Sequence, residues 1–145
     1  MIEREADDGT KNFGVGRASS DSAGRILVVD DDDDVRNLLA AILRRSGYDV
    51  ASAADGEAAW TALSTGNFDL LITDHKMPKL CGLELLQRVR ASDLGLPVIM
   101  LSGNLPIPEQ EFSDWFSPAV AMQKPFMIDQ LLEKVRSFSD AATAA

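Results

Sequence analysis

Four short apolar runs in this chain each end in a polar residue, and this arrangement constrains the fold more than any other feature. The runs are Ile26–Val29, Leu70–Thr73, Val98–Leu101 and Val120–Gln123, and they lead into Asp30-Asp31, Asp74, Ser102 and Lys124-Pro125. Short apolar runs that alternate with helical patterns are typical of buried parallel strands. The carboxyl ends of such strands meet at one edge of an open α/β sheet, where ligands bind. We therefore expect these polar side chains to converge at that edge.

The segment after the first run has the periodicity of an amphipathic helix. Its apolar residues recur at intervals of three and four, which places them in one stripe. Asp32 or Asp33 is suited to the N-cap of this helix, and Gly47 is suited to its C-terminal end. The residues of the stripe are Val35, Leu38, Leu39, Ile42 and Leu43. We expect this helix to pack against the sheet.

The rest of the chain continues the alternation of strand and helix. We predict a short strand at 49–53 and helices at 56–64, at 83–90 and from 126 to near Ser139. Between Asn104 and Pro118, three prolines leave room for only one short helix, at about 109–116. The pattern predicts an α/β fold of the (βα)5 type, over residues 25–139, with right-handed crossovers and an irregular or shortened fourth helix.

Composition and charge exclude several classes of protein. The net charge of −9 argues against direct binding of nucleic acid, and no apolar stretch reaches the roughly 20 residues of a membrane helix. The first residues lack the apolar core of a signal peptide, and Cys81 is the single cysteine. We therefore expect a cytoplasmic protein with no membrane partner. Residues 1–24 are predicted to be a disordered tail and residues 140–145 a flexible C-terminal tail, with no effector domain following.

Four sequence strings occur in an order and spacing that carry a family resemblance. They are ILVVDDDDDVRNLL, LLITDHKMPKLCGLELL, PVIMLSG and KPF. Together they resemble a response-regulator receiver domain of bacterial two-component signalling, of the chemotaxis-regulator-like type. The resemblance implies a flavodoxin-like, doubly wound sheet with strand order 2-1-3-4-5. It also implies a phosphoryl donor, either a sensor histidine kinase or a histidine phosphotransfer protein, and a downstream protein partner that the sequence does not name.

The resemblance further implies a Mg²⁺ site. Asp31 would be a direct ligand and Asp30 an indirect one, Asp74 would bind through one oxygen, and Lys76 would bind through its backbone carbonyl. These groups suit the cation, because Mg²⁺ prefers hard oxygen ligands and binds one or two carboxylates together with phosphate. Three carboxylates this close repel one another, and a cation would relieve that repulsion.

The resemblance makes Asp74 the phosphoacceptor. Lys124, before a proline with a cis peptide bond, would offset charge on the transferring oxygens, and Ser102 would donate a hydroxyl hydrogen bond to one of them. Ala121 stands where receivers often carry an aromatic switch residue. We therefore expect phosphorylation to act by reordering the segment from Asn104 to Pro118, which contains three aromatic residues, Phe112, Trp115 and Phe116.

Two other classes remain open from the residues alone. A haloacid-dehalogenase-like phosphatase also uses a strand-end aspartate, and Asp30 with Asp32 could mimic its D-x-D motif. That class requires a further acidic strand end after the lysine, which the segment after Lys124 lacks, and it leaves Asp74 without a role. A receiver-like adaptor that binds partners without phosphorylation is the third class. The presence of the acids, the hydroxyl and the lysine together argues against it.

Overall fold

The sheet has five parallel strands in the order β2-β1-β3-β4-β5, as the family resemblance implies. The computed structural model describes residues 24–144, and it describes side chains for residues 24–138. The strands are β1 (Arg25–Val29), β2 (Asp49–Ala53), β3 (Leu70–Asp74), β4 (Val98–Ser102) and β5 (Ala119–Gln123). Because β1 lies between β2 and β3, the chain winds in both directions from the first strand, and the α/β fold is the flavodoxin-like one.

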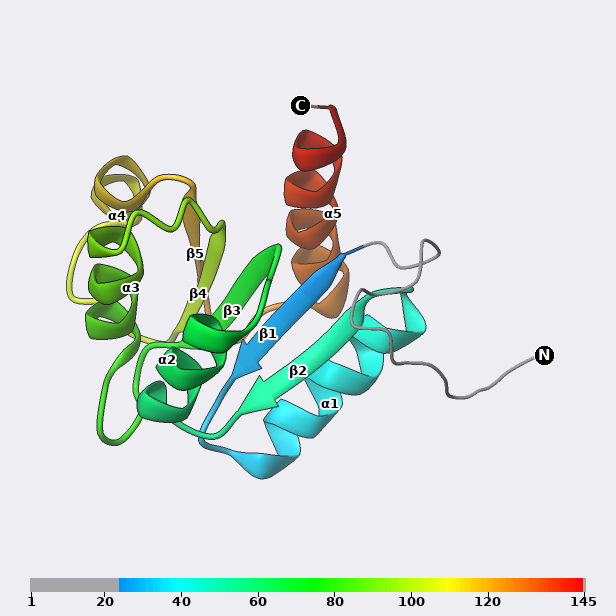
Figure 1. Ribbon diagram of the computed structural model, residues 1–145, viewed down its shortest axis with the longest axis horizontal. Helices are drawn as coiled ribbons and strands as arrows, with labels where there is room; N and C mark the ends of the chain where they lie inside the picture. Colours follow the sequence, from blue (N-terminus) through cyan, green and yellow to red (C-terminus); the bar gives the residue numbers. More distant parts are fainter. Residues whose placement is uncertain (1–23, 145) are drawn as a thin grey trace.

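Helices cover both faces of this sheet (Figure 1). The helices α2 (Gly56–Thr65), α3 (Gly82–Ala91) and α4 (Glu109–Phe116) lie on one face, and α1 (Asp33–Arg45) and α5 (Ile128–Ala144) lie on the other. Alternate strand residues point to opposite faces. Leu27 therefore belongs to the core under α2, α3 and α4, and its neighbour Ile26 belongs to the core under α1 and α5.

Helix α1 begins as predicted, with one exception in its apolar stripe. Asp32 is the N-cap, and its carboxylate accepts hydrogen bonds from two backbone N–H groups of the first turn. Gly47, just past the end, has a φ of +99°, a conformation that favours glycine. Leu39 and Leu43 are buried, but Leu38 is 57% exposed. Leu38 lies about 100° around the helix from Leu39, at the edge of the stripe, so its inclusion in the stripe was wrong.

Helix α4 has the short length that the prolines predict. Phe112 is fully buried, and its ring lies 5.5 Å from the ring of Phe116, centroid to centroid. The N-cap residue is Pro108, which provides no side-chain hydrogen bond to the first turn. The other end is held by Arg90 of α3, whose guanidinium donates to the carbonyl of Phe116 at 2.8 and 3.0 Å and to that of Pro118 at 3.0 Å.

The C-terminal helix is longer than predicted. Helix α5 continues to Ala144, so its predicted end near Ser139 is wrong, and residues 140–144, predicted as part of a flexible tail at 140–145, are helical. Alanine is the strongest helix former, and no glycine or proline interrupts this segment. The predicted N-terminal tail at 1–24 lies outside the described residues except for Gly24, whose carbonyl accepts the N–H of Asp49. Within the described residues, no helix combines the length and apolar character needed to span a bilayer.

Candidate functional site

The carboxyl ends of β1, β3, β4 and β5 bring the predicted polar residues to one edge of the sheet. Two backbone hydrogen bonds continue the pairing just beyond the strands. The N–H of His75 donates to the carbonyl of Leu101 at 3.0 Å, and the N–H of Lys124 donates to the carbonyl of Ser102 at 2.9 Å. Asp30, Asp74 and Ser102 are all buried. Buried polar side chains need partners, so this edge is a prepared polar site.

Asp74 and Lys124 form an ion pair at this edge. The Lys124 ammonium nitrogen lies 3.0 Å from Asp74 Oδ1, and the two side chains are 34% and 10% exposed. The Lys124–Pro125 peptide bond is cis, as the resemblance implies. Partial burial strengthens the attraction relative to an exposed pair. The pair places a cation beside one carboxylate oxygen of Asp74.

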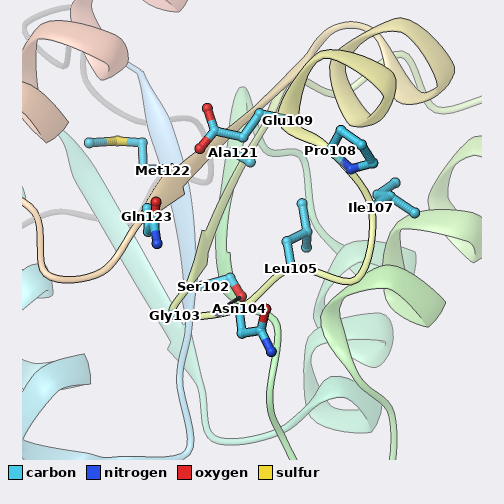
Figure 2. A pocket seen from close by; sticks show the side chains of 10 residues that line it. All are labelled: Ser102, Gly103, Asn104, Leu105, Ile107, Pro108, Glu109, Ala121, Met122 and Gln123. Carbon is cyan, nitrogen blue, oxygen red and sulfur yellow. Dashed lines mark hydrogen bonds between the residues drawn. The ribbon is translucent and has the colours of Figure 1, made fainter.

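Ser102 ends β4 with its hydroxyl facing the start of the next loop (Figure 2). The backbone N–H of Asn104 donates to Ser102 Oγ at 3.0 Å. That bond fixes the oxygen as an acceptor, and the described residues provide no acceptor for the hydroxyl proton, which is therefore available to a ligand.

Asp30, Asp31 and Asp74 form an acidic cluster in which one carboxylate oxygen from each residue lies within 4.8 Å of the other two. Asp30 Oδ1 accepts the N–H of Asp32 at 2.9 Å, whereas Oδ2 is buried and has no hydrogen-bond partner. Burial raises the pKa of Asp30, and the charges of Asp74 and Asp31 raise it further, against the lowering effects of the Asp32 N–H and of Lys124. An unpartnered buried oxygen in a cluster of hard oxygen donors fits a divalent cation such as Mg²⁺.

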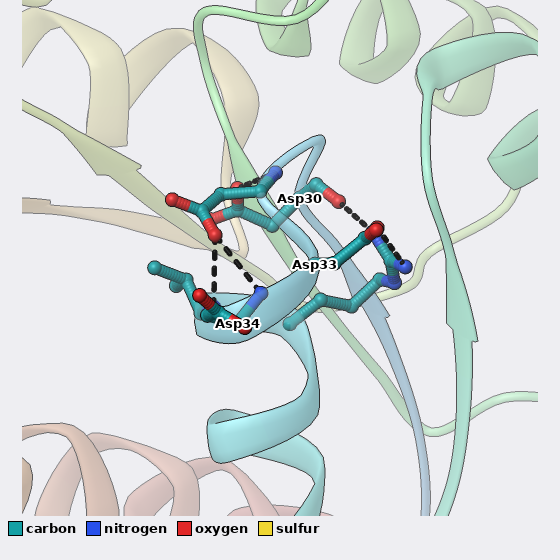
Figure 3. Close-up of polar contacts among 6 residues, drawn as sticks. Asp30, Asp33 and Asp34 are labelled. Atoms are coloured by element: carbon teal, nitrogen blue, oxygen red, sulfur yellow. Dashed lines mark hydrogen bonds and ion pairs between the residues drawn. The ribbon is translucent and has the colours of Figure 1, made fainter.

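Two other aspartates of the run, Asp32 and Asp33, have structural roles (Figure 3). Asp32 caps α1, and Asp33 forms an ion pair with Arg36 one helical turn later. Arg36 also donates to the backbone carbonyl of Asp30 at 2.8 Å, which fixes the backbone at the end of β1. Sequence reasoning missed Arg36, because nothing in its spacing indicates that its guanidinium turns back to the strand end.

The loop after Asp74 is held close to the site. Gly82 at the start of α3 donates its N–H to the His75 carbonyl at 2.8 Å, and a Cβ at Gly82 would lie 2.7 Å from the Asp74 carbonyl oxygen. His75 is half-buried, and burial lowers its pKa. Lys76 is exposed, and the role of its carbonyl as a ligand stays a prediction.

The fold and the site together define a class: an α/β domain with three acids, a hydroxyl and a lysine at the carboxyl edge of a doubly wound sheet. The family model of the response regulator receiver domain matches residues 26–136. The chain therefore belongs to the response-regulator receiver family.

Individual relatives agree with this assignment. The chain is 35% identical over 117 residues to the alkaline phosphatase synthesis transcriptional regulatory protein PhoP of Bacillus subtilis, covering 78% of this chain and 47% of that protein. It thus spans about half the length of several of the curated relatives it matches. The response regulator receiver protein CpdR of Brucella abortus is 32% identical over 118 residues, covering 81% of this chain and 98% of CpdR.

Solved structures show the same fold. The crystal structure of the response regulator TrrA of Thermotoga maritima, in complex with Mg²⁺ and BeF, has 35% sequence identity and a TM-score of 0.69, covering 79% of this chain and 97% of that one. The receiver domain of the hybrid histidine kinase CckA has 36% identity and a TM-score of 0.66, covering 80% and 99%.

Proposed function

We propose that this protein is a phosphorylation-switched receiver that accepts a phosphoryl group on Asp74. The observation that carries the proposal is the 3.0 Å pair between Lys124 and Asp74 beside the acidic cluster. An isolated strand-end aspartate would have no need of this arrangement. A carboxylate nucleophile with a fixed cation at one oxygen and carboxylates at cation-sharing distance is suited to phosphoryl transfer, where catalysis is mostly positioning and charge stabilisation.

The proposed reaction gives each of these side chains a role. A carboxylate oxygen of Asp74 attacks the phosphorus of a phosphohistidine, an O–P bond forms, and the P–N bond to the donor imidazole breaks. Lys124 shifts its ammonium from the carboxylate to a phosphoryl oxygen, and the Ser102 hydroxyl donates to another. Mg²⁺, when bound, would offset charge on the same oxygens. Asp30, Asp31, Asp74 and the Lys76 carbonyl are the groups we propose to hold it.

The proposal also covers partners and location. The phosphoryl donor is a sensor histidine kinase or a histidine phosphotransfer protein, and the output is a change in affinity for a downstream protein rather than turnover of a substrate. We place the protein in the cytoplasm and propose no contact of this domain with nucleic acid or membrane. The net charge of −9 supports the absence of nucleic-acid binding.

Beryllofluoride, which forms a stable analogue of the phosphorylated state, provides the test. Beryllofluoride with Mg²⁺ should shift the amide resonances of residues around Asp74, Ser102 and Lys124 in a ¹H–¹⁵N spectrum, and Asp74→Asn should abolish the shifts. An identical spectrum with and without beryllofluoride would support the adaptor class instead, in which partners bind without phosphorylation.

The structure and a separate assay distinguish the phosphatase class from the proposed receiver. Lys124 is followed by α5 without another strand, so the acidic strand end which that class requires is missing from the described residues. Steady hydrolysis of p-nitrophenyl phosphate that survives Asp74→Asn would favour the phosphatase and contradict the proposal.

A further inference from the structure

A cavity of about 220 Å³ lies between the β4–α4 loop, the first turn of α4 and strand β5. Leu105, Ile107 and Ala121 provide apolar walls, and Figure 2 shows Glu109 at the opposite end of the cavity from Ser102. The lining of the cavity therefore combines apolar side chains with one carboxylate. It also shares a lining residue, Ser102, with the candidate phosphorylation site.

The size of the cavity suits a single aromatic ring. Ala121 is half-buried on β5 and fills little of the space between the strand and the loop. An apolar cavity of about 150 Å³ is large enough to bind benzene. A ring in this cavity would contact Leu105, Ile107 and Ala121 and remove their apolar surface from water, which is favourable.

The charges around the cavity select a cationic occupant. Helix α4 carries Glu109, Glu111 and Asp114 and no basic residue. In the part of the chain that the structure describes, no cationic side chain pairs with Glu109. Trp115 on the same helix is 63% exposed, and an indole face attracts cations. A second copy of this chain would bring another net charge of −9 to the surface, so a basic partner is favoured over self-association.

We propose that this cavity binds an aromatic side chain from a basic segment of a partner protein, with flanking cations on the acidic face of α4. The inference deepens the proposed function, because it names the chemistry of the downstream partner.

Four capped tripeptides separate the contributions of ring and charge. Arg-Tyr-Arg, Gln-Tyr-Gln, Glu-Tyr-Glu and Arg-Ala-Arg are titrated into the full chain and followed by ¹H–¹⁵N shifts, without Mg²⁺ or a phosphodonor. A failure of Asp74 phosphorylation therefore does not affect this test. Arg-Tyr-Arg should shift the amides of Leu105, Ile107 and Ala121 and bind about twofold to fivefold more tightly than Gln-Tyr-Gln, the range of an exposed ion pair. Glu-Tyr-Glu and Arg-Ala-Arg should bind more weakly than either.

Three variants locate the site. Ala121→Phe should fill the cavity and abolish the shifts from Arg-Tyr-Arg in a spectrum that is otherwise dispersed. Glu109→Gln should reduce the preference for Arg-Tyr-Arg over Gln-Tyr-Gln, whereas Glu133→Gln, an equal charge change at an exposed position on α5, should leave it unchanged. Equal affinity for Glu-Tyr-Glu and Arg-Tyr-Arg, shifts that persist in Ala121→Phe, or an unchanged preference for Arg-Tyr-Arg in Glu109→Gln would overturn the proposal.

Discussion

The ammonium of Lys124 lies 3.0 Å from a carboxylate oxygen of Asp74, although β4 separates β3, which ends at Asp74, from β5, which Lys124 follows. Lys124 follows the last residue of β5, and its backbone is held by the carbonyl of Ser102 at the end of β4. The side chain thus reaches across the end of β4 to the end of β3. The lysine offsets part of the charge of the acidic cluster, and under the proposed function it would bind the phosphoryl group added to Asp74.

Loss of Asp31 should weaken the cation site without weakening the fold. Asp31 is exposed, whereas Asp30 is buried, so Asp31→Asn removes a ligand and one repelling charge at little packing cost. We expect Mg²⁺ affinity to fall by about tenfold or more, as measured by NMR titration. The matched variant Asp34→Asn, an exposed aspartate of the same run, should keep the wild-type affinity. Equal affinities in all three proteins would remove Asp31 from the site.

Asp30→Asn should stabilise the metal-free protein at neutral pH. Burial raises the pKa of Asp30 above its ordinary value of 3.8. The free energy of unfolding therefore falls as the pH rises from 3.8 to the raised pKa, because the unfolded chain ionises this carboxyl first. The asparagine keeps an oxygen to accept the Asp32 N–H but has no charge. Thermal unfolding should therefore show a higher melting temperature than wild type at pH 7 and little difference well below pH 3.8. A variant that is less stable than wild type at pH 7 would contradict the assigned cost of burying this charge.

Arg90→Met should destabilise the protein by about 2 kcal/mol, because it leaves the carbonyls of Phe116 and Pro118 without their charged donor. Arg88→Met is the matched control on the same helix. The Arg88 side chain is 44% exposed and forms only a 3.8 Å pair with Glu57, so its loss should cost less than about 0.5 kcal/mol. Urea unfolding measures both variants. Equal free energies of unfolding would show that Arg90 does not anchor α4.

Phosphorylation should change hydrogen exchange in the segment from Asn104 to Pro118. This segment has three prolines, an N-cap without a side-chain hydrogen bond, and a short helix, all of which favour local opening. Beryllofluoride and Mg²⁺ should alter amide protection there and change the exposure of Phe112, Trp115 and Phe116. Protection changes confined to the loops after Asp30 and Asp74 would exclude this output mechanism.

The sequence predicts the sheet and its polar edge well, because both depend on local patterns. Asp30, Asp74 and Ser102 each stand at the carboxyl end of a buried run, and parallel strands bring these ends to one edge of the sheet. The short α4 follows equally directly from its prolines. The exposure of Leu38 could not be predicted, because the burial of a residue at the edge of an apolar stripe depends on how far the helix is rotated against the sheet.

Contacts made by long side chains were beyond sequence reasoning. Arg36 and Arg90 each bind backbone carbonyls through a guanidinium, and the carbonyl bound by Arg90 at Phe116 belongs to another helix. No periodicity encodes such partners. The unpartnered oxygen of Asp30 is likewise visible only once the chain is folded, since it depends on what surrounds the carboxylate.

The central claim is that Asp74 accepts a phosphoryl group, and intact mass spectrometry with acetyl phosphate and Mg²⁺ tests it most directly. The wild-type chain should gain the mass of one phosphoryl group, peptide mapping should place the group on Asp74, and omission of Mg²⁺ should suppress the gain. Asp74→Asn should gain nothing, whereas Asp34→Asn should behave as wild type. A phosphoryl group on another residue, or a gain that persists in Asp74→Asn, would contradict the account.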